Sequence, residues 1–249
     1  MEYNKHQRGE IMLKINNLTK KYGDKVAVDN ISLEIKPGEI YGFIGHNGAG
    51  KTTTIRCCCG LLNFDSGEIL INGKSIKDDP LACKMEFAYI PDNPVLFEYL
   101  SGIEYLNFIG DVYKVGKAER EERIRKYADQ FELTQNLAQP ISSYSHGMKQ
   151  KLAIIAALIH NPKLIVLDEP FVGLDPIAAF KFKEIMREVC NNGGAVFFST
   201  HVLDVAEKLC DKVAIIKSGK LIKTGTMEEV KGDASLEETF LELEMEKDA

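Results

Sequence analysis

The segment that decides the fold is Gly45-His46-Asn47-Gly48-Ala49-Gly50-Lys51-Thr52. It matches the phosphate-binding pattern G-x-x-x-x-G-K-[S/T], in which x is any residue. A short apolar run, Ile40 to Ile44, precedes it and predicts a strand, and a stretch of helical character follows from Lys51 to about Leu62. Strand, glycine-rich loop and helix in this order are the context that a phosphate loop requires, and a chance glycine-rich turn does not explain it.

The residue types in this loop suit the binding of a nucleoside triphosphate. Glycines let backbone N–H groups approach phosphate oxygens closely, and the N-terminus of the following helix adds partial positive charge. We expect the ammonium of Lys51 to lie on the outer phosphates and the Thr52 hydroxyl to ligate Mg²⁺. The expected ligand is therefore ATP with Mg²⁺. The loop residues expected to contact it are Gly45, His46, Asn47, Gly48, Ala49, Gly50, Lys51, Thr52 and Thr53.

An acidic pair follows a second apolar run. Leu164 to Leu167 has the continuous apolar character of a strand buried on both faces of a parallel sheet, and Asp168 and Glu169 come directly after it. Ligands of such sheets bind at the carboxyl ends of the strands. We expect Asp168 to hold Mg²⁺, directly or through water, and Glu169 to polarise the attacking water. Taken alone the pair could equally be surface charge, but after a phosphate loop it predicts ATP hydrolysis.

The remaining chain predicts an α/β fold in one domain, a P-loop NTPase core with a mainly parallel sheet. Residues 11–35 are expected to form strands broken by turns, an N-terminal antiparallel β region. Helical spacing without intervening strands indicates an inserted helical subdomain. After it, strand and helix alternate again, with Ala195 to Phe198 as another buried strand. The predicted boundaries are 1–92 and 161–231 for the core, 93–160 for the subdomain, and 232–249 for a C-terminal helix with the stripe Leu236, Phe240 and Leu243.

Composition limits the class of protein. The 249 residues carry a net charge of −6, from 31 basic and 37 acidic residues, which argues against a nucleic-acid clamp, so no nucleic-acid partner is expected. The longest strongly apolar run, Leu152 to Ile159, is far shorter than the ~20 residues of a membrane span. Met1 to Glu10 is polar and does not resemble a signal peptide. We therefore expect a cytoplasmic protein whose membrane role, if it has one, works through a partner.

Three of the six cysteines, Cys57 to Cys59, are consecutive. Neighbouring residues on a helix point in different directions, so the run is not a disulfide framework. We expect buried thiols that pack the helix against the sheet, with a redox sensor as the alternative. The histidines His6 and His160 are expected at the surface or at a helix end.

Further segments indicate which class of P-loop ATPase this is. Tyr144-Ser145-His146-Gly147-Met148-Lys149-Gln150 resembles the L-S-G-G-Q signature of ABC ATPases. Asp168-Glu169-Pro170 with Gly173-Leu174-Asp175-Pro176 resembles the end of Walker B and the D-loop, Ser199-Thr200-His201 resembles the switch histidine, and Tyr22 stands where the family has an adenine-stacking aromatic. Order and spacing agree over nearly the whole chain, which resembles the ATP-binding subunit of an ABC transporter. The runs Tyr89 to Leu96 and Gly147 to Lys151 resemble export-type, ABC-2-like ATPases of the Ecs-type branch.

This resemblance implies a site shared between two ATPase subunits that meet head to tail. Ser145 and the Gly147 backbone would face the γ-phosphate held by the other subunit, and Asp175 would join the nucleotide site. His201 would contact the γ-phosphate, and the catalytic set would be Glu169, His201 and Lys51. The partner would be a second copy or a similar chain.

The resemblance also implies an integral membrane permease, to which the subunit would bind on the cytoplasmic face. The contact is expected beside Asp92 to Tyr105. The apolar residues that cluster there are Val95, Leu96, Phe97, Tyr99 and Tyr105. The alternative is that they form the core of the subdomain itself.

Two positions depart from the family pattern. Asp92 stands where the Q-loop usually has glutamine, and its carboxylate could still hold Mg²⁺ or its water, although an exposed loop acid is the alternative. His146 replaces the first signature glycine and could donate a hydrogen bond or point away. Two rival functions stay open. A soluble ABC protein of translation or repair would carry two cassettes or long coiled coils, and an inactive regulatory nucleotide-binding module would lack the catalytic residues.

Overall fold

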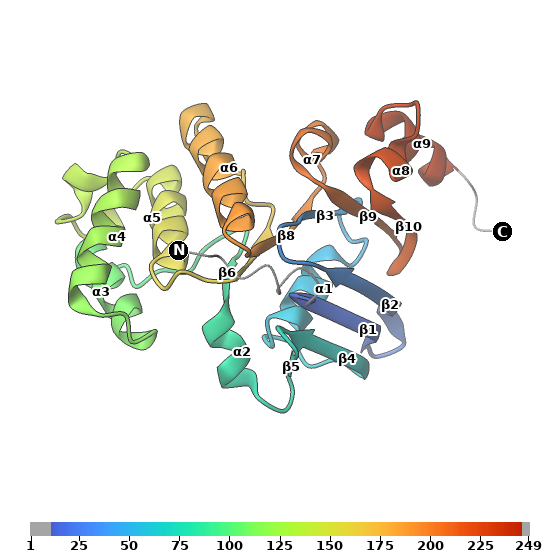
Figure 1. Ribbon diagram of the computed structural model, residues 1–249, viewed down its shortest axis with the longest axis horizontal. Coiled ribbons are helices and arrows are strands. Elements are labelled where there is room, and N and C mark those ends of the chain that lie inside the picture. Colours follow the sequence, from blue (N-terminus) through green and yellow to red (C-terminus); the bar gives the residue numbers. More distant parts are fainter. Residues whose placement is uncertain (1–10, 246–249) are drawn as a thin grey trace, which may run out of the picture.

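The computed structural model describes residues 11–245, and Figure 1 shows their arrangement. The apolar runs of the sequence form the centre of a sheet with strand order β10-β9-β3-β8-β7-β6. Every residue of β3 (Ile40–Ile44), β7 (Leu164–Asp168) and β8 (Ala195–Thr200) is buried. These strands run parallel to one another and to β6 (Phe87–Ile90) and β9 (Lys212–Lys217), whereas β10 (Lys220–Thr226) is antiparallel to β9. The mainly parallel sheet predicted from the sequence is confirmed.

A second, antiparallel sheet has the order β2-β1-β4-β5. Its strands are β1 (Leu13–Tyr22), β2 (Lys25–Ile35), β4 (Ser66–Ile71) and β5 (Lys74–Ser75). Figure 1 shows it beside α1 (Lys51–Cys58), and both contribute to one apolar cluster with the inner side of the parallel sheet. The predicted N-terminal antiparallel region is thus present, and the strand β5 is an addition to it.

The cysteines of α1 and its C-terminal end are buried in that cluster, as predicted. Burial raises the pKa of Cys57 to about 11 and raises the pKa of Cys58 and Cys59 well above the ordinary thiol value. Because the thiolate is the reactive form, these thiols are poor candidates for a redox sensor.

Between β6 and β7 the chain is helical. It forms α3 (Gly102–Val112), α4 (Lys117–Gln130) and α5 (His146–Leu158), with short 3-10 turns before α5. The buried face of α5 joins α3 and α4 to the parallel sheet in one continuous apolar cluster, which includes Leu106, Ile124, Leu152, Ile165 and Phe198. The subdomain boundaries at residues 93 and 160 stay a prediction, because no break in the core marks them.

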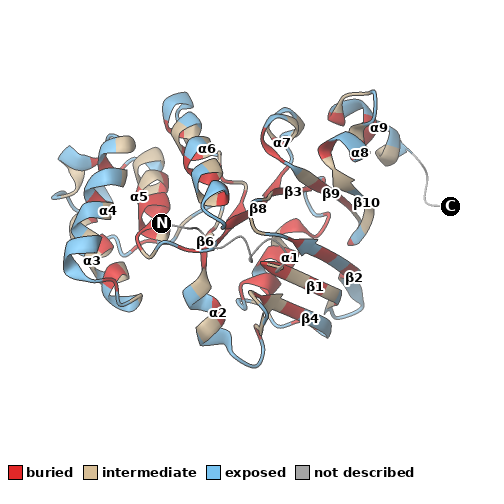
Figure 2. Cartoon of the chain, in the orientation of Figure 1, coloured by how far each residue is buried: buried red, intermediate tan, exposed pale blue. Residues whose placement is uncertain are grey.

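The other helices cover the sheet edges and faces. They are α2 (Pro80–Glu86), α6 (Pro176–Asn191), α7 (Leu203–Leu209), α8 (Met227–Lys231) and α9 (Leu236–Met245). The predicted stripe of α9 is confirmed, since Leu236 and Phe240 are buried and Leu243 packs against the same cluster. Figure 2 shows each of the long helices turning one side to solvent. The predictions for Met1 to Glu10, including His6, and for residues 246–249 lie outside the described residues.

Strand register brings the functional segments to one edge. Ile44 pairs with Thr200, Asp168 with Ser199, and Ile90 with Leu167. The loops that follow β3, β6, β7 and β8 therefore all leave the sheet at its carboxyl edge, which is where open parallel sheets bind their ligands.

Candidate functional site

The phosphate loop connects β3 to α1 and is packed tightly against the neighbouring chain. A Cβ atom on Gly45 would lie 2.4 Å from the carbonyl oxygen of Ile216. Gly50, the residue before α1, has a φ of +113°, and a Cβ there would lie 2.6 Å from the Ala27 carbonyl oxygen. Only glycine fits both positions, which explains the two glycines that the loop pattern requires.

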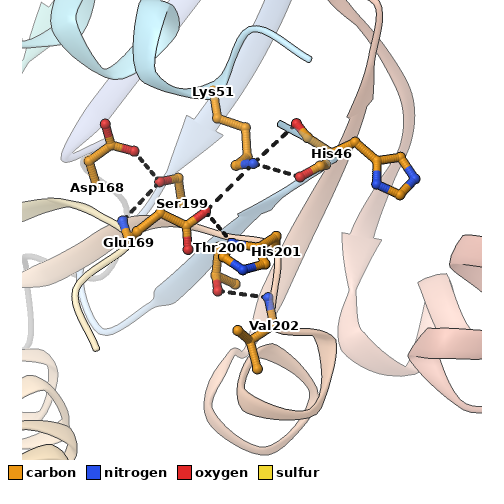
Figure 3. Close-up of polar contacts among 9 residues, drawn as sticks. His46, Lys51, Asp168, Glu169, Ser199, Thr200, His201 and Val202 are labelled. Carbon is orange, nitrogen blue, oxygen red and sulfur yellow. Dashed lines mark hydrogen bonds and ion pairs between the residues drawn. The ribbon is translucent and has the colours of Figure 1, made fainter. Parts of the chain in front are cut away.

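Lys51 is the first residue of α1 and is 6% exposed. Its Nζ donates to the carbonyl oxygens of Gly45 at 2.6 Å and His46 at 3.2 Å, and lies 3.6 Å from Glu169 Oε1 (Figure 3). A buried ammonium requires such partners. The side chain therefore extends across the loop, where phosphate oxygens would compete with these carbonyls for the same three protons.

Asp168 ends β7 with its carboxylate almost fully buried, at 1% exposure. Oδ1 accepts a hydrogen bond of 2.5 Å from Ser199 Oγ, while Oδ2 has no hydrogen-bond partner among the described residues. A buried, unpartnered carboxylate oxygen is costly unless a cation or its water satisfies it. Residues 11–245 contain no group of three or more His, Cys, Asp or Glu side chains that could hold a metal alone. The fit is to Mg²⁺, which proteins usually bind through one or two side chains together with phosphate oxygens.

Glu169 lies between Lys51 and His201. Its Oε1 is 2.9 Å from His201 Nδ1, without the alignment of a hydrogen bond, and its side chain is 16% exposed. Glu169 has a φ of +48°, a backbone conformation that residues other than glycine and asparagine adopt rarely. Such conformations are found where the surrounding structure imposes them, often at functional sites.

His201 follows β8 in a tight turn. Thr200 Oγ1 accepts a hydrogen bond from the Val202 N–H at 3.0 Å, which shapes the turn and directs the imidazole to Glu169 (Figure 3). The three residues predicted to be catalytic, Lys51, Glu169 and His201, are thus brought together by the ends of three adjacent strands.

The remaining loop residues have different environments. Asn47 and Gly48 are exposed at the tip, and Thr52 and Thr53 are half-buried in the first turn of α1. The His46 side chain is turned to α9, where Nε2 lies 3.7 Å from Glu244 Oε2 and the ring contacts Phe240. His46 therefore offers the loop its backbone, and its side chain serves the C-terminal helix. Tyr22, at the end of β1, is 51% exposed, as a stacking platform for adenine would be.

The signature-like segment lies elsewhere. Figure 1 shows α5 beside α3 and α4 at the left of the molecule, apart from α1, which lies nearer the centre. Ser145 caps α5, accepting from the Met148 N–H at 3.3 Å, and is exposed. The His146 ring packs against Gly173, where an added Cβ would fall 2.6 Å from the ring, so this residue contacts the D-loop-like segment of its own chain. Gly147 faces the same segment, since a Cβ atom added to it would lie 2.9 Å from the carbonyl oxygen of Gly173.

Asp175 joins the signature helix to the D-loop-like segment. Its Oδ1 caps α6, and its Oδ2 forms an ion pair of 2.7 Å with Lys151 of α5. The hydrogen bond from Lys151 is the main cause of the lowered pKa of this carboxyl group. The ion pair keeps the start of α6 beside the start of α5.

Asp92 and the apolar residues after it lie beyond β6. Asp92 is exposed at the carboxyl edge of the sheet, and its metal role stays a prediction. Val95 and Tyr99 are 89% and 81% exposed, and Phe97 contacts the rings of Tyr99 and Phe108. Leu96 is only 8% exposed and packs in the core, which agrees with the alternative given for this residue.

A cavity of about 180 Å³ opens beside this segment, between the end of β6, α3 and α5. Tyr89, Tyr105 and Tyr113 line it, together with His160, whose ring stacks on Tyr113 at 3.7 Å. Burial lowers the pKa of His160 to about 4, so the imidazole is neutral near pH 7. His160 is at a helix end, as predicted, but partly buried.

Ser199 contacts both acids of the site, but in the sequence it stands only beside the switch histidine, and no role was predicted for it. The sequence indicates its role only weakly, because Ser199 is simply a serine that follows the apolar run Ala195 to Phe198 and precedes Thr200-His201. The ion pair between Glu98 and Lys149, at 2.5 Å, was equally hidden, since the residues lie far apart in the chain.

Comparison with known proteins decides the family. The profile of the ABC transporter family matches residues 28–172, more than half of the chain. The chain is 38% identical over 240 residues to the ATP-binding protein EcsA of Bacillus subtilis, an alignment that covers 94% of this chain and 97% of EcsA. This chain belongs to the ABC transporter ATP-binding subunits.

Other relatives of the ABC subunit agree. It is 36% identical over 215 residues to the linearmycin resistance protein LnrL of Bacillus subtilis, covering 86% of this chain and 69% of LnrL. A solved ATP-binding subunit of an ABC transporter superposes with a TM-score of 0.90 at 36% identity, covering 94% and 99% of the two chains. The dimeric cassette MJ0796, bound to ADP and Pi, gives 0.79 at 25% identity, covering 87% and 99%.

The ABC subunit is therefore an ATPase, and ATP with Mg²⁺ is the usual ligand of its family. This agrees with the retained Lys51, Asp168, Glu169 and His201 and disfavours the inactive regulatory module. Within residues 11–245, none of the helices is both long and apolar enough to cross a bilayer.

Proposed function

We propose that this ABC subunit drives transport, in the export direction, through a separate membrane permease, by ATP-dependent association of two ATPase subunits on the cytoplasmic face. One observation carries the proposal: Lys51, Asp168, Glu169 and His201 lie together, whereas the exposed signature residue Ser145 starts α5, which lies apart from α1 beside α3 and α4. A complete site then requires the signature of another subunit. The name of the relative LnrL, a resistance protein, supports export.

The residues of one chain prepare the nucleotide for attack. Phosphate oxygens draw Lys51 from Glu169 and from the loop carbonyls, and the loop N–H groups hold the phosphates at the N-terminus of α1. Asp168, through its unpartnered Oδ2, and the Thr52 hydroxyl would hold Mg²⁺, which would supply positive charge to the phosphate oxygens. Glu169, released from the lysine and supported by His201, accepts the proton of the attacking water.

The second subunit completes the site. Ser145 Oγ and the N-terminus of α5 approach the γ-phosphate and add hydrogen bonds and partial positive charge. ATP then contacts both subunits, so its binding stabilises the dimer by mass action, and hydrolysis removes that bridge. Asp175, fixed by Lys151, keeps the D-loop-like segment beside the signature during this approach.

A complementation experiment tests the shared site. Lys51→Ala and Ser145→Glu are each expected to inactivate their own homodimer, the first through the phosphate loop and the second by repelling the γ-phosphate. In a mixture, the mixed dimer has one intact site, formed by the normal loop of one variant and the normal signature of the other. Random pairing should restore roughly a quarter of wild-type ATPase activity.

The control is Ser142→Glu, which puts the same charge on an exposed residue one turn earlier and should stay active. Gel filtration with ATP in the Glu169→Gln background would report the dimer directly. A mixture that stays as inactive as its components would contradict the shared site.

The permease contact is proposed at the exposed segment from Val95 to Tyr99 and the cavity behind it. Val95 and Tyr99 are too exposed to serve the core, and the cavity offers an aromatic lining to an apolar side chain. Glu98 of this segment pairs with Lys149 in the first turn of α5, so the proposed contact is linked to the helix that carries Ser145.

Removal of one exposed aromatic tests this contact. Tyr99→Ala is expected to reduce co-purification with the membrane partner by at least about tenfold, because interface aromatics commonly contribute more than ~1.4 kcal/mol. The intrinsic ATPase activity should remain. Leu81→Ala removes a side chain of similar exposure, 73%, from α2 and is the matched control. Equal recovery of the partner with both variants would place the contact on another surface.

A further inference from the structure

Ser199 is a fully buried hydroxyl that contacts both acidic residues of the site. It is the residue before the last of β8, is 0% exposed, and pairs with Asp168 of the neighbouring strand β7. Its Oγ donates to Asp168 Oδ1 at 2.5 Å and accepts from the Glu169 N–H at 3.2 Å (Figure 3). The Glu169 N–H also reaches the Ser199 carbonyl oxygen at 3.2 Å. A hydroxyl has one proton and two lone pairs, so both contacts can form at once.

The bond to Asp168 decides which carboxylate oxygen is available. Because Oδ1 is occupied by Ser199, the unpartnered and buried Oδ2 is left for a cation or its water. A carboxylate held by one strong hydrogen bond also loses its freedom to rotate about χ2. The hydroxyl thereby sets both the identity and the direction of the ligand atom.

The bond to Glu169 acts on the backbone. Glu169 has a φ of +48°, and its N–H is held between the hydroxyl and the carbonyl of one residue. This conformation turns the side chain from the sheet toward Lys51 and His201. The same hydroxyl therefore contacts the backbone that aims the proposed base.

We infer that Ser199 is a positioning residue of the ATPase site, whose hydroxyl orients the Asp168 carboxylate toward Mg²⁺ and fixes the backbone of Glu169 for proton transfer. The inference deepens the proposed function and rests on the roles given there to Asp168 and Glu169. Ser199 contacts Asp168 and Glu169 and acts through these two acids, without touching the nucleotide or the attacking water itself.

Metal binding tests this role without turnover. Ser199→Ala is expected to weaken Mn²⁺ binding in the presence of a non-hydrolysable ATP analogue by ~10- to 100-fold, the usual effect of losing a partner of a metal ligand. Electron paramagnetic resonance of free Mn²⁺ measures it. Binding of the analogue in EDTA should be unchanged, because Lys51 and the loop are intact.

Two comparisons separate positioning from packing. Ser199→Thr and Ser199→Val add nearly the same volume, but only threonine keeps the hydroxyl, so Mn²⁺ affinity should stay higher for threonine. Thr239→Ala removes another buried hydroxyl, 5% exposed in α9, and should leave Mn²⁺ affinity unchanged. Thermal unfolding of each variant identifies any variant that fails to fold. If the threonine or valine variant fails to fold, the comparison of Ser199→Ala with Thr239→Ala tests the positioning role.

Asp168→Asn, measured in parallel, distinguishes the possible failures. If Asp168→Asn weakens Mn²⁺ binding while Ser199→Ala does not, the role of Ser199 is refuted and the proposed function stands. If neither substitution changes Mn²⁺ binding, the metal role of Asp168 fails and the inference fails with it. Equal affinities of the threonine and valine variants would also overturn the positioning role.

Discussion

Glu169→Gln is expected to lower the ATP turnover number by about 10² to 10⁴-fold, the range for loss of a positioned general base, while ATP binding is retained. Glutamine keeps the shape of the side chain and the same backbone demand at a φ of +48°, but it cannot take a proton from water. It also removes the negative charge 3.6 Å from Lys51 Nζ, which leaves the lysine more available to phosphates. ATP affinity should therefore be equal to that of the wild type or higher.

The measurement combines steady-state hydrolysis with calorimetric ATP titration. Gel filtration with ATP and Mg²⁺ should show a persistent dimer, because the nucleotide that bridges the subunits is no longer consumed. Glu188→Gln, on the exposed side of α6, is the matched control and should leave turnover unchanged. Wild-type turnover in Glu169→Gln would refute the catalytic role of Glu169.

Lys51→Ala is expected to weaken ATP binding by ~10- to 150-fold, which corresponds to the ~1.5–3 kcal/mol of a hydrogen bond to a charged group. The variant loses the ammonium that would hold the outer phosphates and leaves the Gly45 carbonyl without its bond of 2.6 Å. Turnover should fall in proportion at subsaturating ATP and should not recover fully at saturation, because charge stabilisation is also lost.

Comparison of ATP with AMP makes this prediction specific. AMP lacks the outer phosphates, so its affinity should change little in Lys51→Ala, whereas a general collapse of the loop would weaken both nucleotides. Lys126→Ala, a surface lysine of α4 paired with Glu188, is the control for removal of a positive charge. Equal losses for AMP and ATP would show that Lys51 supports the loop rather than the outer phosphates.

Much of this fold could be predicted from the sequence because its strongest patterns are local. The phosphate loop requires a strand before it and a helix after it, and the runs Leu164 to Leu167 and Ala195 to Phe198 have no polar residue that a half-exposed strand would need. Once these strands are placed in parallel, Lys51, Asp168, Glu169 and His201 must emerge at one edge. The core of the site followed from that constraint.

The parts that could not be predicted depend on contacts between distant segments. α2 was missed because its short sequence buries only Cys83 and carries no apolar stripe. The phosphate-loop pattern fixes the backbone at His46 but not its side chain, which packs on α9 nearly two hundred residues later. The exposure of Val95 and the burial of Leu96 arise from packing that neighbouring apolar residues in a loop do not reveal.

The unbroken apolar cluster that joins α3, α4 and α5 to the parallel sheet has a mechanical consequence. Two units that share one close-packed core cannot separate without exposing it, so they should unfold together as one cooperative unit. The movements left to α5 are small sliding displacements over its neighbours. We expect Ser145 and the ion pair of Glu98 with Lys149 to move together in such displacements. The helical region would then move as a rigid body and not about a hinge.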